Sequence, residues 1–541
     1  MVFASYSFLF IFLPIALVGY YLAARLGANF AVGWLVLASL AFYAVWNPVF
    51  VILLVCSIAF NFAIGRALLA PERKEDTKSR HRLLFIGVAG NLLPLVFFKY
   101  LGPALAYAHS ISLVSPQFDF KVILPLGISF FTFTQIGYLV ECNHGGGRDL
   151  DIIRYAAFVT FFPHLIAGPI YHIREIGPQL LNPVSCRLRF SNLSVGTSFF
   201  IMGLAKKVLL ADPLAEVVKI GFAHPGDFQM FTTWLYALAY SLQLYFDFSG
   251  YSDMAIGLGY MFGIRLPINF NSPYKSRNII DFWQRWHITL TRYLTLLLYN
   301  PLAMHIRRRR LARHGVSHRD NETLSAFGSL IVVPLFFTMT LAGIWHGAGF
   351  QFLIFGLMHG VYLTINHAWR MYGPKAAAKN RGRLARAGVV VWKVALTYMA
   401  VLAAQVMFRA SSFGAALQML GGMIGLHGVD PLPVPNTVMA VVRHLGPIGG
   451  LLQSHHILAV SGLDSVPPPA SLALRFFIVW ALPNSQTIMA KFSPSLTAVK
   501  PAAPRWLLWQ PTLRWALGLG LLLALSLMSL QQTKVFLYFQ F

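Results

Sequence analysis

Long apolar runs separated by short polar segments dominate this sequence. A bilayer-spanning helix needs roughly 20 apolar residues, and several runs approach or reach that length. The pattern therefore predicts an all-α, polytopic membrane bundle of roughly 11 spanning helices with added re-entrant or interfacial helices. The clearest expected spans are residues 5–24, 30–46, 48–69, 83–101, 122–140, 231–246, 389–408, 470–482 and 514–530.

One run, residues 323–369, contains no Asp, Glu, Lys or Arg and is long enough to cross a bilayer twice. His346 lies at its midpoint, between Trp345 and glycines that leave the backbone free to turn. A polar or ionisable group at membrane depth is costly unless it is satisfied or functional. His346 is therefore either a hydrogen-bonding partner of a neighbouring helix or a functional group.

Three segments depart from simple spans. Residues 158–170 are apolar but broken by Pro163 and Pro169, which predicts a re-entrant segment. Residues 193–211 carry Lys206 and Lys207, which suits a helix near the cytoplasmic interface. Residues 428–469 form a Pro- and Gly-containing insert that is expected to be an extracytoplasmic loop with short helices. No long polar linker divides residues 1–541, so a single membrane domain is predicted.

Composition supports the membrane assignment and explains the charge. The chain is 57% hydrophobic and 11% charged, whereas soluble domains are about 25% charged. The net charge of +25 does not require a nucleic-acid partner, because basic residues concentrate in the short segments 71–82, 305–313 and 375–386. These segments are expected on the cytoplasmic side, which places the N-terminus outside; docking of an acidic partner there is the functional alternative. The three cysteines show no paired spacing that would indicate a disulfide framework or a metal site.

Residues 245–302 are too charged for a lipid-exposed span and too aromatic for a solvated loop. We expect helices wedged inside the bundle, with charges such as Asp247 and Asp253 paired or facing a wet cavity. On a helix from about Asn278, Asp281 and Arg285 are i,i+4 neighbours that can pair. The same helix would place Trp283, Trp286 and His287 on an adjoining stripe.

Two histidines, His287 and His346, thus come from two unusual membrane segments. Each is either a structural polar contact or a general base, because neutral imidazole titrates near neutrality. A zinc site is disfavoured, since no HExxH motif is present, and no metal is expected. His359 is expected to be a hydrogen-bonded helix residue.

Several ordered segments resemble the membrane-bound O-acyltransferase (MBOAT) family, in particular its bacterial alginate O-acetylation branch. They are LPLGISFFTFTQIGYLVE (124–141), FFPHLIAGPI (161–170), YFDFSGYSDMAIGLG (245–259), NFNSPYKSRNIIDFWQRWHITLTRYL (269–294), GIWHGAGFQFLIFGLMHG (343–360), VMFRA (406–410) and ALPNSQTIM (481–489). The chain departs from the family pattern at Cys142, where relatives continue differently, at His164, which replaces a commoner Gln, and in the 428–469 insert.

The resemblance implies an O-acyltransferase of the bacterial inner membrane with His346 as the essential catalytic residue and His287 as the second functional histidine. The expected donor is acetyl-CoA or an acyl-carrier thioester on the cytoplasmic side, with no metal or redox cofactor. The acceptor would be an exported polysaccharide or a periplasmic acetyl-transfer partner protein. Supporting or channel-lining roles are expected for Trp283, Trp286, Trp345, Asp281, Arg285, Asp247 and Asp253.

Two other functions remain open at this point. A transporter would use the polar centre as a substrate path, but it predicts paired repeats, and the sequence shows none. A non-catalytic scaffold of a secretion complex is the second. The absence of a Gly-x-Ser-x-Gly motif argues against a serine acyl-enzyme.

Overall fold

The computed structural model describes residues 2–71, 76–111, 122–147, 150–314, 323–374, 382–434, 458–460 and 469–530. Within these ranges the chain is helical, apart from a short parallel ladder that pairs β1 (Leu432–Val434) with β2 (Leu458–Val460). The all-α prediction therefore holds except for this ladder. The ladder belongs to the 428–469 insert; the short helices expected there, and His444, His455 and His456, lie outside the described residues.

The helices group into two compact units, which we describe separately. Unit 1 comprises Met1–Val208, Phe248–Asn269 and Ser485–Phe541, and unit 2 comprises Leu209–Asp247 and Phe270–Asn484. Two of the four boundaries between the units fall inside η4 (Lys206–Ala211) and α11 (Met230–Met261), so both helices contribute residues to both units. This grouping does not test the predicted single membrane domain, which stays a prediction.

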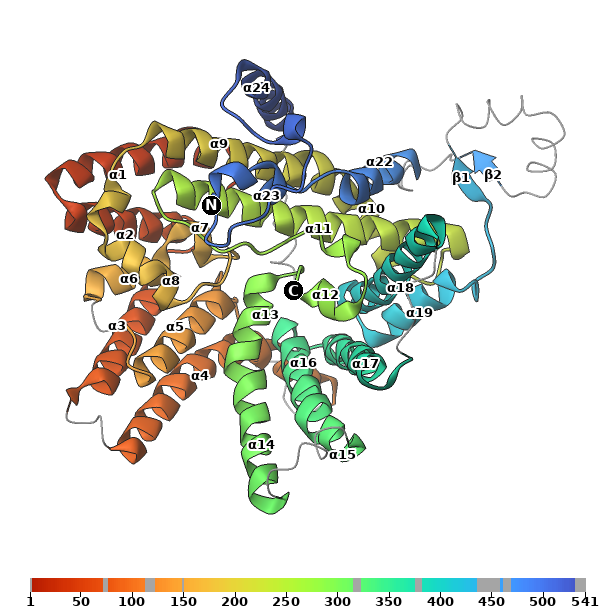
Figure 1. Ribbon diagram of the computed structural model, residues 1–541, viewed down its shortest axis with the longest axis horizontal. Helices are drawn as coiled ribbons and strands as arrows, with labels where there is room; N and C mark the ends of the chain where they lie inside the picture. Colours follow the sequence, from red (N-terminus) through yellow and green to blue (C-terminus); the bar gives the residue numbers. More distant parts are fainter. Residues whose placement is uncertain are drawn as a thin grey trace. The chain divides into compact units, whose positions relative to one another are not determined.

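Unit 1 is built mainly from the N-terminal helices (Figure 1). Besides parts of η4 and α11, it contains η1 (Phe8–Phe12), α1 (Leu13–Leu26), α2 (Ala28–Ala44), α3 (Val49–Leu69), α4 (Thr77–Ser110), α5 (Ile128–Asn143), α6 (Ile152–Thr160), α7 (Phe162–Leu165), α8 (Ile173–Leu181), η3 (Pro183–Cys186), α9 (Phe190–Ala205), α23 (Ser485–Ile488), η10 (Ala490–Phe492), η11 (Arg505–Leu507) and α24 (Leu513–Met528).

Unit 2 carries the central and later helices, and in Figure 1 the helix formed by α13, η6 and α14 runs beside α16. Its elements are α10 (Asp212–Ala223), η5 (Pro273–Lys275), α12 (Ile279–Trp283), α13 (Ile288–Leu294), η6 (Thr295–Tyr299), α14 (Asn300–His314), α15 (Leu324–Phe327), η8 (Gly328–Val332), α16 (Val333–His346), α17 (Phe350–Tyr372), α18 (Arg383–Arg409), α19 (Phe413–Met423), β1, β2 and α22 (Pro469–Ala481).

Six helical segments among the described residues are long and apolar enough to cross a membrane. They are Phe8–Leu26, Val49–Leu69, Thr77–Ser110, Phe190–Ala223, Leu324–His346 and Arg383–Arg409. The shorter apolar helices α2, α22 and α24 lie where further spans were expected. The chain is thus a multi-pass membrane protein, while the total of roughly 11 spans stays a prediction.

Several expected spans have different ends in the structure. The one expected at 231–246 is part of the longer α11, which continues to Met261. The helix expected at 83–101 is the longer α4, which continues through Pro94 and Pro103; prolines are tolerated in membrane helices when neighbouring groups satisfy the freed backbone. The span expected to begin at residue 122 begins at Ile128 instead. The backbone of Gly127, the residue immediately before α5, is left-handed with φ 71°. A right-handed helix cannot continue through that conformation, so α5 begins only after Gly127.

The proline-containing segment 158–170 is broken as expected, because α6 ends at Thr160 and α7 ends at Leu165. Its core residue, His164, is fully buried. The His164 ring hydrogen-bonds Thr134 Oγ1 at 2.9 Å and the Pro169 carbonyl at 2.8 Å. Protein groups thus satisfy this irregular backbone, as a buried membrane segment requires. Its re-entrant course through the bilayer stays a prediction.

Glycines bring α9 and the C-terminal part of α11 into backbone contact within unit 1. A Cβ added at Gly203 would lie 2.6 Å from the Gly250 carbonyl oxygen, and one at Gly196 would lie 2.7 Å from the Gly257 carbonyl oxygen. The pairs are spaced by seven residues on each helix, so they lie on one face. Small residues are what allow membrane helices to approach this closely.

The same interface buries an ion pair that the sequence pattern did not indicate. Lys206 Nζ lies 2.5 Å from Asp253 Oδ2, and Ser485 Oγ donates to the same carboxylate oxygen at 2.5 Å. The Lys206 and Asp253 side chains are only 16% and 5% exposed. Lys206 is therefore buried within the protein with Asp253 as its compensating charge, and the position of this helix near the cytoplasmic interface stays a prediction.

We predict that Asp253→Ala destabilises the protein by about 3–5 kcal/mol, because it leaves the Lys206 ammonium buried without its partner. Glu216→Ala is the matched control, since the Lys219–Glu216 pair is 73% and 67% exposed and such pairs contribute little. Thermal unfolding in detergent would measure both. Equal losses in the two variants would contradict the assigned role of the buried pair.

Candidate active site

The run 323–369 forms a helical hairpin, and the first of its two helical arms ends at His346. The helix from Leu324 finishes as α16 at His346, and α17 begins at Phe350. The predicted pair of helices with His346 at their junction is therefore confirmed. Of the two arms, Leu324–His346 is among the candidate membrane spans, and the second crossing stays a prediction. His346 is 9% exposed, and it is the last helical residue before the turn.

Glycines fix how the two arms of this hairpin cross. A Cβ at Gly343 would lie 2.3 Å from the Phe352 carbonyl oxygen, and one at Gly356 would lie 2.3 Å from the Met339 carbonyl oxygen. The atoms that an added Cβ would meet are backbone atoms. A clash with them could not be relieved by the rotation of a neighbouring side chain. Since Gly343 precedes His346 by one helical turn, this crossing sets the position of the imidazole.

Aromatic rings surround His346 on several sides. The ring centroid of Trp345 lies 4.5 Å from that of His346, and those of Phe408 and Phe355 lie at 4.9 and 6.0 Å. Phe408 comes from α18, so three helices supply the enclosure. Rings packed this way restrict the rotamers of His346 and keep bulk water away from it.

The second histidine lies in a short, irregular segment between α12 and α13. Asn278 caps α12 by accepting a hydrogen bond from the Asp281 N–H at 2.9 Å, and Arg285 Nε lies 2.7 Å from Asp281 Oδ1. The predicted helix start near Asn278 and the predicted ion pair are confirmed. However, α12 ends at Trp283, so the predicted helical stripe of Trp283, Trp286 and His287 is wrong.

His287 is 2% exposed and has φ 42°, a left-handed conformation that non-glycine residues rarely adopt. It precedes the first residue of α13. Such a conformation costs of order 1–3 kcal/mol and persists only where the surrounding structure enforces it, most often at functional sites. Among the described non-glycine residues, only Ser272 and Ser493 share this conformation with His287.

A chain of ring contacts connects the α12 segment to the hairpin within unit 2. Trp283 Nε1 donates to His359 Nδ1 at 3.2 Å, which confirms His359 as a hydrogen-bonded helix residue. The Phe355 ring then lies 4.8 Å from His359 and 6.0 Å from His346. The element that precedes His287 is therefore coupled through packed rings to the element that carries His346.

Trp286 anchors the other side of the His287 segment. Its indole stacks on Phe282 at 5.6 Å and on Tyr274 at 6.1 Å. Tyr274 is held in turn by a buried polar network: its hydroxyl donates to the Ser241 carbonyl at 2.7 Å and accepts from Gln405 Nε2 at 3.0 Å. Sequence analysis missed this network, because its members lie on helices far apart along the chain.

The two remaining predicted residues have different surroundings. Asp247 is 2% exposed on α11 and belongs to unit 2 with both histidines. Asp253 belongs to unit 1, where Lys206 and Ser485 occupy its carboxylate. Asp253 therefore has a structural partner of its own. Among the described residues no group of three or more His, Cys, Asp or Glu side chains could hold a metal ion.

Comparison with known proteins identifies the family. A protein of Helicobacter pylori named "Peptidoglycan O-acetyltransferase" is 38% identical over 451 residues, covering 78% of this chain and 80% of that protein. A Pseudomonas aeruginosa protein named "Probable alginate O-acetylase AlgI" is 35% identical over 570 residues and covers both chains fully. The chain belongs to the membrane-bound O-acyltransferase family.

Membership makes the protein a multi-pass O-acyltransferase. The MBOAT family profile matches residues 145–317, which include the strained His287 segment. A more distant relative, a Bacillus subtilis protein named "Teichoic acid D-alanyltransferase", is 26% identical over 301 residues, covering 55% of this chain and 71% of that protein. Family membership thus favours acyl transfer over the transporter and scaffold alternatives.

We predict that Gly343→Ala lowers both stability and acyl transfer in this MBOAT protein. The new methyl group would meet the Phe352 carbonyl, and overpacking of this kind typically costs about 1–3 kcal/mol while shifting the helix that ends at His346. Gly328→Ala is the control, because a Cβ there meets nothing within 4 Å. Thermal unfolding and acetyl transfer would be measured on the same samples. A Gly343→Ala protein with unchanged stability and activity would contradict the assigned role of the close α16–α17 crossing.

Proposed function

We propose that this protein transfers an acetyl group from a cytoplasmic thioester donor to hydroxyls of an exported or cell-surface polysaccharide. The observation that carries the proposal is the buried His346 at the end of α16, coupled by packed rings to the strained His287 segment. The names of the relatives support the acceptor class, since they refer to peptidoglycan and alginate O-acetylation. Because those polymers differ, the proposal extends only to a polysaccharide hydroxyl.

His346 is proposed as the general base. Its imidazole accepts the proton of the attacking hydroxyl while the hydroxyl oxygen forms a bond to the thioester carbonyl carbon. The carbon–sulfur bond then breaks, and the departing thiolate takes up the proton. His346 lies at the carbonyl end of α16, where the helix dipole favours a positive charge and so stabilises the imidazolium formed during transfer.

His287 is proposed to orient the reacting groups or donate a hydrogen bond to the carbonyl oxygen. One preorganised donor of this kind contributes roughly 3–4 kcal/mol to transition-state stabilisation. The left-handed backbone at His287 and the stacking of Trp286 on Phe282 and Tyr274 support a preset ring position. The proposed supporting residues are Trp283, Trp345, Asp281, Arg285 and Asp247. Because a thioester donor is already activated, the proposed reaction requires no metal or redox cofactor.

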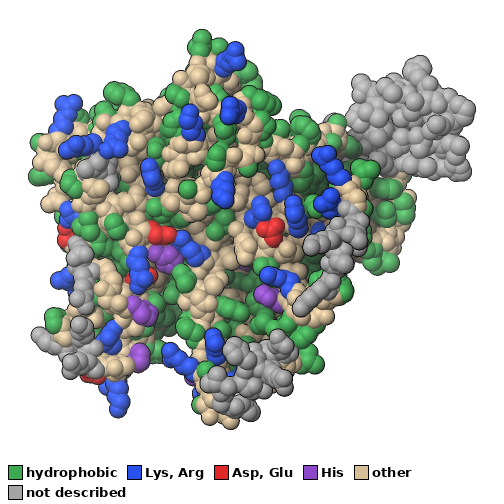
Figure 2. Space-filling model, viewed as in Figure 1, with side chains coloured by type: hydrophobic (Ala, Val, Ile, Leu, Met, Phe, Trp, Pro, Cys, Tyr) green, Lys and Arg blue, Asp and Glu red, His purple; other side chains and the backbone are tan. Residues whose placement is uncertain are grey.

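We further propose that the protein lies in a bacterial inner membrane, which it crosses with roughly 11 spans, and that its N-terminus is periplasmic. The exposed basic helix α14, with Arg307, Arg308 and Arg309, supports a cytoplasmic position for that end by the positive-inside rule. On the face shown in Figure 2, Lys and Arg side chains far outnumber Asp and Glu side chains. A periplasmic partner protein that carries the acetyl group onward is an alternative immediate acceptor.

We predict that His346→Ala lowers turnover of an acetyl thioester by ~10²–10⁴-fold, the usual contribution of a general base. The purified protein would be assayed for thiol release and for acetyl transfer to an oligosaccharide acceptor. His305→Ala is the matched control, because His305 is an exposed histidine on α14. Wild-type protein without thioester turnover would sink the proposed reaction, and a fully active His346→Ala protein would sink the assigned base.

A second prediction separates the two histidines. His287→Ala should lower kcat by roughly 10²–10³-fold, because it removes a donor to the negative charge that develops in the transition state. The KM for the thioester should change far less. A purely structural His287 would instead lower thermal stability with little effect on kcat of the folded fraction, and that outcome would remove it from the site.

A further inference from the structure

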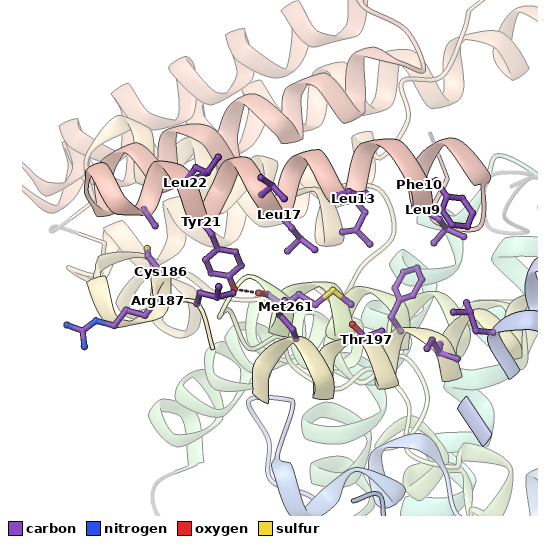
Figure 3. A pocket seen from close by; sticks show the side chains of 18 of the residues that line it. Leu9, Phe10, Leu13, Leu17, Tyr21, Leu22, Cys186, Arg187, Thr197 and Met261 are labelled. Atoms are coloured by element: carbon purple, nitrogen blue, oxygen red, sulfur yellow. Dashed lines mark hydrogen bonds between the residues drawn. The ribbon is translucent and has the colours of Figure 1, made fainter. Parts of the chain in front are cut away.

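Unit 1 contains an apolar cavity of about 840 Å³ that none of the chemistry above uses. It lies between α1, η3, α9 and α24, and Figure 3 shows Leu13 and Leu17 of α1 on one side with Thr197 and Met261 opposite. Tyr21 closes part of the wall, since its hydroxyl donates to the Met261 carbonyl. The volume is in the range of small-molecule sites.

The cavity is flanked by side chains that face the membrane. Val18 and Leu22 line it and are 60% and 54% exposed, and Leu188 on the opposite side is 48% exposed. Large apolar side chains exposed along a candidate membrane span face lipid tails in the bilayer. The cavity is therefore within reach of lipid tails.

One end of the cavity is strongly basic. Arg25 lies in the last turn of α1. Arg187 follows η3 at the end near Tyr21 and Leu22 (Figure 3). Both arginines are exposed, and neither guanidinium makes a hydrogen bond or an ion pair with any described residue. Planar guanidinium groups bind phosphate oxygens in a bidentate manner. An apolar slot with two such groups at one end matches an amphiphile that has an anionic head.

The dimensions fit a lipid tail from one leaflet. The lining runs along η1 and α1 from Leu9 to Leu22, about 20 Å at 1.5 Å per residue. This exceeds half of the ~30 Å hydrocarbon core, so a single acyl chain can lie along it. The positive-inside expectation also places Arg25 on the cytoplasmic side, where anionic lipids concentrate.

We propose that this cavity binds one acyl chain of an anionic glycerophospholipid, with the lipid phosphate held by Arg25 and Arg187. The site fills the space between α1 and α9 and so holds these helices together within unit 1. It is independent of the acyl-transfer reaction, and its occupant is a component of the membrane.

Native mass spectrometry of the purified full chain, titrated with phosphatidylglycerol or phosphatidylethanolamine, tests the proposal. We expect wild-type protein to prefer phosphatidylglycerol by roughly 30-fold, about fivefold for each guanidinium. Arg25→Gln with Arg187→Gln should remove this preference, whereas Arg25→Lys with Arg187→Lys should retain most of it. Arg307→Gln with Arg308→Gln, both exposed on α14, should leave it unchanged.

A second pair of variants tests the apolar part of the site. Leu17→Trp should weaken binding of both lipids, because Leu17 lines the cavity. Ile15→Trp should not, because Ile15 is 58% exposed on α1 outside the lining. Equal wild-type binding of the two lipids, an undiminished preference in the glutamine variant, or equal losses in Leu17→Trp and Ile15→Trp would overturn the proposal. Saturable binding of inorganic phosphate alone, as tight as that of the lipid, would overturn the role of the acyl chain.

Discussion

The contact of backbone with backbone between α16 and α17 is the constraint on which the site depends. Where Gly343 meets Phe352 and Gly356 meets Met339, no side chain separates the two helices. Membrane helices gain little from hydrophobic association, because lipid tails are as apolar as their side chains, so close packing must hold them. Here that packing places the end of α16, and with it His346, beside the rings of Phe355 and Phe408. The same device recurs in unit 1, where glycines of α9 and α11 meet.

Much of this organisation could be predicted from the sequence, because local signals agree with it. The charge-free run 323–369 predicted a hairpin with His346 at its junction, since the glycines beside His346 permit a turn. The i,i+4 spacing of Asp281 and Arg285 predicted their ion pair, and a helix was expected to start near Asn278, where α12 begins. Ordered motifs then predicted the family, which the relatives confirm.

The remainder depends on contacts between distant parts of the chain. Helical periodicity placed His287 on a stripe with Trp283, but α12 is only one turn long and His287 is left-handed. The hydrogen bonds that satisfy Tyr274 come from Ser241 and Gln405, which no local pattern connects to it. Likewise, no local pattern indicated that Lys206 pairs with Asp253, because the two residues lie on different helices. Buried polar groups are paired by the fold, so their partners become evident only once the helices are packed.

The proposed mechanism requires His287 and His346 to act on one thioester carbonyl. The most direct measurement is an experimental structure of the protein in lipid nanodiscs with a non-hydrolysable acetyl thioester analogue. The account predicts the analogue's carbonyl group within ~2.6–3.5 Å of one ring nitrogen of His287, with His346 facing the side from which a hydroxyl would attack. An analogue bound away from either imidazole, or two imidazoles on opposite faces of unit 2, would contradict it.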